Sequence, residues 1–111
     1  MTEGAFVDIG GLDDIPLRGA RTVTTAHGII AIFRTGDNAV FALHDQCPHR
    51  GGPISQGIVH GHGVTCPLHG WVFSLESGAA IGEDAPCIAR FRTRIEERRI
   101  LLDIAGPIRA A

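Results

Sequence analysis

Two short loops, each with one cysteine and one histidine, constrain this chain more than any other feature of its sequence. The first loop reads Cys47-x-His49 and the second Cys66-x-x-His69, with sixteen residues between His49 and Cys66. A proline directly follows each cysteine and stiffens the loop backbone, and nearby glycines permit tight turns close to a bound group. Two sulfur and two nitrogen ligands are therefore available, which is enough to hold a metal centre.

The order of cysteine and histidine along the chain helps to distinguish between possible kinds of metal centre. A structural zinc site is one alternative, because tetrahedral zinc also accepts two sulfurs and two nitrogens; four unrelated residues are another. Zinc-finger sequences usually group their cysteines together and their histidines together, whereas each loop here mixes the two. The mixed loops resemble the signature of the Rieske family. That resemblance implies a [2Fe–2S] cluster with Cys47 and Cys66 on one iron and His49 and His69 on the other.

Length, charge and cysteine count limit the remaining possibilities. A chain of 111 residues is the size of one domain, and a net charge of −2 argues against a nucleic-acid or anionic-membrane partner. The N-terminus lacks the basic start and apolar core of a signal peptide, and the longest apolar run, Ile29 to Phe33, is too short to cross a bilayer. Only Cys87 remains outside the two loops, so we expect no intramolecular disulfide, which fits a cytoplasmic location. We expect the Cys87 side chain to be partly buried.

The apolar pattern predicts many short strands and no helix of ten or more residues. The expected strands are 5–9, 21–25, 29–34, 39–43, 57–59, 63–65, 71–74, 89–95 and 99–104. Gly36-Asp37-Asn38 is a hairpin signal, and arginines alternate with apolar or β-branched residues along 89–95. We therefore expect an all-β, antiparallel sandwich or small barrel. Within this single domain, residues 44–75 would form a cluster-binding subdomain inserted into a basal part made of 5–43 and 76–104, as the Rieske resemblance also implies.

Residues near the two loops have competing interpretations. His44, His60 and His62 lie near the loops in sequence, and His60-x-His62 could suggest a second metal site. Neither His60 nor His62 has a cysteine at the required spacing, so we expect a turn with solvated histidines there. We expect His27 to be exposed in a turn. Trp71 is either a shield for the cluster or an ordinary core residue, and Arg50 is either a solvated loop residue or a contact for an acidic group on a partner.

The resemblance also separates classes within the family. Respiratory members carry a membrane helix and an additional cysteine in each loop, at positions matching Gly52 and Leu68 here, and oxygenase α-subunits need a much longer chain. Two classes remain: the small subunit of assimilatory NAD(P)H-dependent nitrite reductase, and a Rieske ferredoxin that serves an oxygenase. Segments 30–34, 47–53, 56–59, 74–78, 85–87 and 99–102 are similar to the first class.

That similarity implies an electron-transfer role beside a large flavin- and sirohaem-containing subunit that reduces nitrite to ammonium. The chain shows no nucleophile elbow, nucleotide-binding glycine loop or paired carboxylates with metal spacing, so we expect no autonomous catalytic site. A non-redox structural subunit with a vacant or zinc-filled site is the alternative of another class. High-potential Rieske proteins resemble this motif but carry serine and tyrosine where Trp71 and Phe73 stand here, which predicts a low reduction potential.

Overall fold

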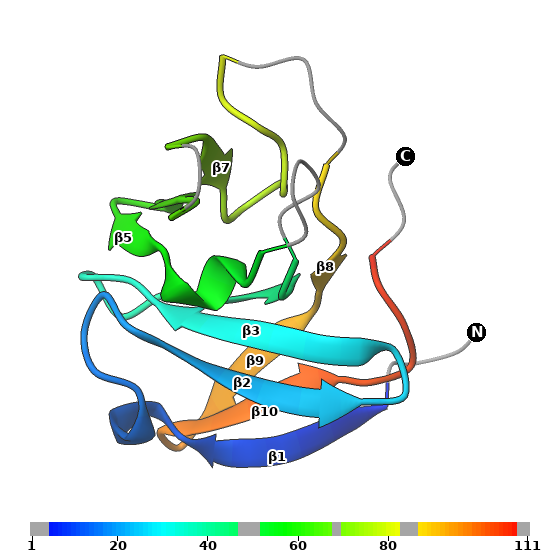
Figure 1. The fold of residues 1–111 in the computed structure, drawn as a ribbon. Coiled ribbons are helices and arrows are strands. Elements are labelled where there is room, and N and C mark those ends of the chain that lie inside the picture. The colour runs from blue at the N-terminus through cyan, green and yellow to red at the C-terminus, as the bar shows by residue number, and fades with distance from the viewer. Residues whose placement is uncertain (1–4, 47–51, 68–69, 83–86, 109–111) are drawn as a thin grey trace.

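The computed structural model describes residues 5–46, 52–67, 70–82 and 87–108, which form three antiparallel sheets (Figure 1). The first sheet has the order β1-β10-β9, the second β2-β3-β4-β8 and the third β5-β6-β7. The strands are β1 (Phe6–Gly11), β2 (Ala20–Thr25), β3 (Gly28–Arg34), β4 (Val40–His44), β5 (Ile58–His60), β6 (Gly63–Thr65), β7 (Val72–Ser74), β8 (Arg90–Phe91), β9 (Thr93–Glu96) and β10 (Arg99–Asp103). Two single-turn 3₁₀ helices, η1 (Leu12–Asp14) and η2 (Ile54–Gln56), are the helical elements in the described ranges. The expected all-β, antiparallel class is confirmed.

The predicted hairpin at residues 36–38 joins β3 to β4. The Thr35 backbone N–H donates to the Ala39 carbonyl at 2.9 Å, and the Ala39 N–H donates to the Thr35 hydroxyl oxygen at 3.0 Å. Asn38 has a φ of 68°, a left-handed conformation that asparagine tolerates better than most residues. Thr35 is fully buried, so the base of the hairpin is fixed by a satisfied polar residue.

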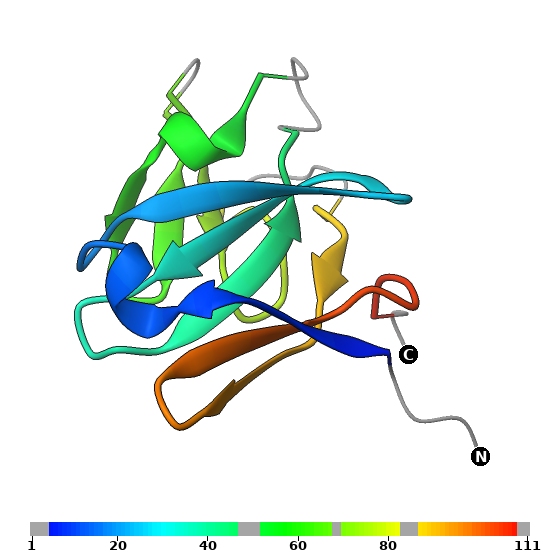
Figure 2. The same cartoon turned by 90° about the horizontal axis from the view of Figure 1, so that it is seen from below.

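Strand β3 supplies side chains to two hydrophobic clusters of the described residues. Ile30 and Ile32 pack in a cluster with residues of β4, β8 and β10, whereas Ala31 and Phe33 pack in a second cluster with residues of the third sheet. Because successive residues of a strand point to opposite faces, one continuous apolar run serves two cores. In Figure 2 the second sheet accordingly lies between β1 and β10 on one side and β5 to β7 on the other.

The single strand expected over 89–95 is two strands in the structure. Phe91 of β8 pairs with Ala42 of β4, whereas β9 pairs with β10. At the break, the Arg92 carbonyl accepts a hydrogen bond from the Asp103 N–H at 3.0 Å. Burial still alternates through the break, from buried Phe91 to exposed Arg92 and half-buried Thr93, but the chain changes its pairing partner there.

No helix within the described ranges has the length and apolar character needed to cross a bilayer.

Candidate metal centre

The second ligand loop begins where β6 ends, at Cys66. The Cys66 backbone N–H donates to the Trp71 carbonyl at 2.7 Å, and the Gly70 N–H donates to the Cys66 carbonyl at 3.0 Å. Gly70 has a φ of +73°, which glycine adopts without a steric penalty. These bonds continue the β6–β7 ladder and close the loop over a few residues. The two ends of the second ligand loop are therefore held beside each other.

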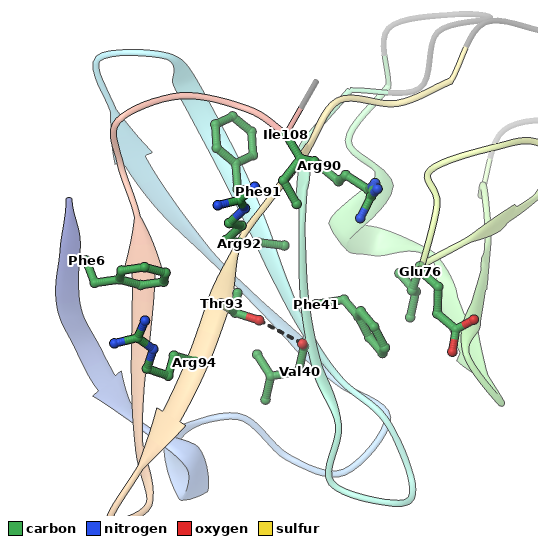
Figure 3. A pocket seen from close by; sticks show the side chains of 12 residues that line it. Phe6, Val40, Phe41, Glu76, Arg90, Phe91, Arg92, Thr93, Arg94 and Ile108 are labelled. Carbon is green, nitrogen blue, oxygen red and sulfur yellow. Dashed lines mark hydrogen bonds between the residues drawn. The ribbon is translucent and has the colours of Figure 1, made fainter. Parts of the chain in front are cut away.

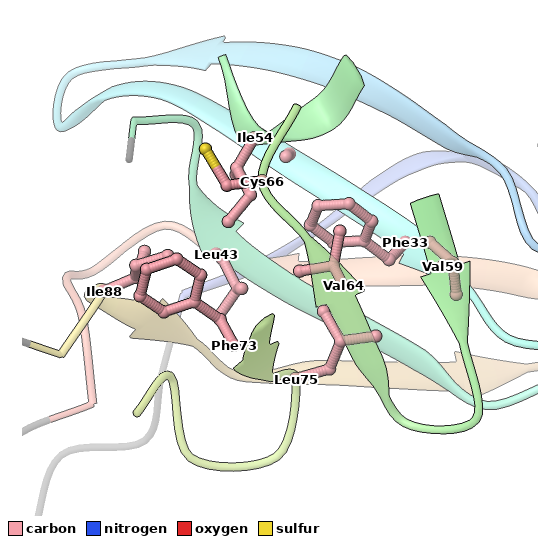
Figure 4. Close-up of a cluster of buried hydrophobic side chains, with 10 residues drawn as sticks. Phe33, Leu43, Ile54, Val59, Val64, Cys66, Phe73, Leu75 and Ile88 are labelled. Carbon is pink, nitrogen blue, oxygen red and sulfur yellow. The ribbon is translucent and has the colours of Figure 1, made fainter. Parts of the chain in front are cut away.

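Cys66 lies at the edge of the second hydrophobic cluster, where its side chain is 1 % exposed (Figure 4). Its neighbours in this cluster include Ile54 of η2 and Leu43 of β4. Both elements flank the first ligand loop, so packing brings the ends of that loop into the cluster that contains Cys66. A thiolate ligand fits this position, because a buried sulfur bound to iron is shielded from water.

The first ligand loop is closed at its base by a carboxylate. Asp45 accepts a hydrogen bond from the Ser55 backbone N–H at 2.7 Å and a second from the Ser55 hydroxyl at 2.8 Å. The Asp45 N–H in turn donates to the Ile29 carbonyl at 2.9 Å. The described flanks of the first ligand loop are thus held to each other, and Asp45 is held to the second sheet. No spacing rule links Asp45 to Ser55, so this pair cannot be recognised from the sequence.

Three of the four predicted ligands, Cys47, His49 and His69, lie outside the described residues, as do Arg50 and Leu68. Within the described residues, no group of three or more histidine, cysteine or acidic side chains is arranged to hold a metal ion. The structure therefore places Cys66 and the flanks of both loops, and the ligand set remains a prediction.

His62 is not the solvated turn residue that we expected. Its Nδ1 lies 2.7 Å from Glu76 Oε2, and its Nε2 lies 3.0 Å from Asp37 Oδ2. Its ring also packs on Phe41, with 5.1 Å between ring centroids. His62 thereby connects the β5–β6 turn both to the chain after β7 and to the β3–β4 hairpin.

The two carboxylates change the protonation of this cluster. The hydrogen bonds that His62 donates to Glu76, and then to Asp37, raise the pKa of His62 above its usual value. The pKa of Asp37 falls to about 2, first because of its hydrogen bond with Thr35 and then because of His62. Both ring nitrogens face carboxylate oxygens, and only an imidazolium can donate from both. Imidazolium is therefore the form that satisfies this geometry.

The other residues named from the sequence have simpler surroundings. His60 is exposed, with its Nε2 2.7 Å from the Thr65 hydroxyl oxygen, and His27 is exposed as expected. The expectation of a partly buried Cys87 is wrong, because that side chain is exposed. Trp71 is half-buried and packs against the second hydrophobic cluster, with its ring 6.4 Å from that of the fully buried Phe73. The core interpretation of Trp71 is thus supported, and its role as a shield stays a prediction.

Among curated proteins, the chain is similar both to a protein of about its own length and to part of a much longer one. Over 82 residues the chain is 33 % identical to the ferredoxin subunit of anthranilate 1,2-dioxygenase from Burkholderia cepacia, covering 71 % of this chain and 75 % of that protein. Over 44 residues it is 48 % identical to the 4beta-methylsterol monooxygenase of Methylococcus capsulatus, covering 40 % of this chain. The chain spans only 12 % of that longer protein.

Solved structures with the same fold include two that are described as nitrite reductase small subunits. A protein described as an NADPH nitrite reductase small subunit superposes with a TM-score of 0.80 at 27 % identity, covering 88 % of this chain and 97 % of that one. A Mycobacterium tuberculosis protein described as an NADH-dependent nitrite reductase small subunit superposes with a TM-score of 0.83 at 21 % identity, covering 99 % of this chain and 100 % of that one, and shows the shared fold.

The family model of the Rieske [2Fe–2S] domain matches residues 5–94. This match includes both ligand loops and most of the three sheets, and it agrees with the buried Cys66 at the edge of the second cluster. The chain belongs to the Rieske [2Fe–2S] family.

Proposed function

We propose that Cys47 and Cys66 bind one iron of a [2Fe–2S] cluster and that His49 and His69 bind the other. The observation that carries this assignment is the burial of Cys66 in a loop whose ends are held by two backbone hydrogen bonds. When bound, the cluster supplies one-electron transfer. The Cys66 side of the site excludes water, and we assign the two histidines to the exposed end, through which a partner would exchange electrons.

We propose the same division of the chain that the sequence predicts. The cluster-binding subdomain comprises residues 44–75, and the basal part comprises 5–43 and 76–104. The third sheet falls within the first of these segments, and it packs on the basal part through one face of β3. Asp45 and Ser55 would hold the first ligand loop at the junction between the two parts.

The ligand assignment is tested by single substitutions. His49→Ala, Cys66→Ala and His69→Ala should each abolish the normal electron paramagnetic resonance signal, because an open iron position makes the cluster labile. His60→Ala is the matched control, since this exposed histidine contacts Thr65 and lies outside the proposed ligand set. Full iron content and an unchanged signal in any of the three variants would remove that residue from the set.

We propose that the chain is the small subunit of an NAD(P)H-dependent nitrite reductase and works beside a large flavin- and sirohaem-containing subunit. Support comes from the match to a described NADPH nitrite reductase small subunit over nearly the whole of both chains. The protein should co-purify with that large subunit and be required for full NAD(P)H-dependent nitrite reduction. Unimpaired nitrite reduction in its absence would refute this assignment.

A second candidate is a ferredoxin that delivers electrons to an oxygenase. The 33 % identity to the anthranilate 1,2-dioxygenase ferredoxin subunit favours this class. Reduced protein should then restore turnover of an oxygenase component and leave nitrite reduction unaffected. A structural subunit without redox function is distinguished from both by iron and sulfide analysis, because it would contain no cluster or would contain zinc.

We also propose a cytoplasmic location. An exposed thiol such as Cys87 persists as a thiol in a reducing compartment, whereas disulfides form in oxidising ones. Cell fractionation followed by immunodetection tests this assignment, and recovery of the protein outside the cytoplasm would contradict it.

A further inference from the structure

An open groove of about 540 Å³ lies beside the segment in which the chain passes from β8 to β9 (Figure 3). Its charged lining residues are Arg90, Arg92, Arg94 and Glu76. In Figure 3, Phe41 and Glu76 lie across the groove from this arginine-bearing segment. We call this feature the arginine groove. Its lining carries a net charge of +2, whereas the whole chain carries −2.

Two of these arginines have no anionic partner among the described residues. Arg98 and Arg99 show the contrast, because each forms an ion pair with an aspartate, at 2.6 Å and 3.0 Å. For the half-buried Arg90 and the exposed Arg92, the described part of the chain provides neither a side-chain hydrogen bond nor an ion pair. Within the described ranges, nothing therefore occupies their guanidinium groups, which can accept an anion supplied by another molecule.

The third arginine is oriented by an aromatic ring. The guanidinium carbon of Arg94 lies 4.3 Å from the ring centroid of Phe6, a cation–π contact. Its ion pair with Glu96, at 3.4 Å, joins two exposed side chains and is therefore weak. A carboxylate arriving in the groove can replace this pairing while the ring continues to hold the guanidinium.

The spacing of the arginines suits an extended acidic chain. They recur at every second residue of a nearly continuous extended segment, so neighbouring arginine Cα atoms are separated by about 6.6 Å at a rise of about 3.3 Å per residue. An extended peptide with a carboxylate at every second position has the same repeat. The groove is also open, and its arginines are exposed or half-buried, which suits a peptide better than an enclosed small anion.

From this charge and spacing we infer that the arginine groove binds an extended acidic segment of the partner protein that exchanges electrons with this chain. The inference rests on the proposed electron-transfer function for the existence of that partner. It adds a docking surface formed by Arg90, Arg92 and Arg94, apart from the ligand loops. Each carboxylate of the partner would accept two parallel N–H hydrogen bonds from one guanidinium group.

The test measures peptide binding to the full-length, cluster-loaded protein by fluorescence anisotropy. The probe is a dye-labelled peptide of eight residues in which glutamate and valine alternate, and the matched probe has glutamine at each glutamate position. Arg90→Gln and Arg92→Gln should each weaken binding of the glutamate peptide about tenfold, the effect of losing one hydrogen bond to a charged group. Arg18→Gln is the control, because it removes an exposed arginine that does not line the groove. It should change the affinity less than about twofold.

Three outcomes would overturn the inference. They are equal binding of the glutamine peptide, equal weakening by Arg18→Gln, and displacement by free glutarate at the peptide's own concentration, which would indicate a small-anion site. The visible spectrum and melting temperature of each variant establish that it is folded and loaded. Loss of peptide binding in a loaded protein concerns the groove alone, whereas loss of the cluster signal concerns the proposed ligands, so the two failures are distinguishable.

Discussion

The pair formed by Asp45 and Ser55 should control how firmly the protein holds its cluster. Asp45→Ala removes both hydrogen bonds across the base of the first ligand loop, whereas Ser55→Ala removes only the bond from the hydroxyl. A hydrogen bond to a charged group contributes roughly 1.5 kcal/mol at the lower end of its range, which suits half-buried partners. We therefore expect Asp45→Ala to lower the free energy of unfolding by about 2–3 kcal/mol, and Ser55→Ala to lower it by about half as much.

These free energies predict measurable changes in thermal stability. For a domain of about this size, 1 kcal/mol corresponds to roughly 4 °C in melting temperature, so Asp45→Ala should lower it by about 8–12 °C. The rate at which visible absorption disappears on warming should rise as well, because opening the loop exposes the cluster site. In the double variant, Ser55→Ala should add almost nothing to Asp45→Ala, since the contact is already lost.

Asp8→Ala is the matched control for this experiment. Asp8 also accepts a backbone N–H, from Gly10, and also pairs with another side chain, Arg99, but it lies on β1 and away from the ligand loops. Its substitution should leave the rate of cluster loss unchanged. The reasoning would be refuted if Asp45→Ala shifted the melting temperature by less than about 2 °C, or if Asp8→Ala accelerated cluster loss equally.

Two further predictions concern pH and potential. Glu76 and Asp37 raise the pKa of His62 in the folded protein. The stability that His62 contributes is therefore fully present below pH 6.5, the usual pKa of histidine, and is lost as the pH rises through the raised pKa. The stability difference between the wild type and His62→Gln should therefore shrink above pH 6.5, and a difference that grows in alkali would contradict this sign. Because Trp71 and Phe73 lack hydroxyls, the reduction potential should lie near the low end of the Rieske range, about −150 mV. Protein-film voltammetry measures this potential; Trp71→Ser with Phe73→Tyr should raise it, and a wild-type midpoint well above 0 mV would contradict the reasoning.

Local patterns in the sequence determined the family, the fold class and the approximate bounds of most strands. The two loops are recognisable because ligand type and spacing are local properties. The hairpin at 36–38 is predictable for the same reason, since its turn chemistry lies within a few residues. The apolar run at 29–33 correctly predicts a strand, but the run alone does not show that alternate residues enter two different clusters.

The tertiary structure alone decided which distant residues meet. The division of 89–95 at Arg92 depends on hydrogen bonding to β4 on one side of the break and to β10 on the other, and neither partner can be read from the alternation. His62 meets Asp37 because the third sheet packs on the second, and it meets Glu76 because β6 pairs with β7. Asp45 meets Ser55 because β4 and η2 share a cluster. The periodicity of apolar side chains indicates the conformation of one strand. The contacts of His62 and Asp45, in contrast, depend on where separate strands lie relative to one another. That placement is set by packing across the whole chain.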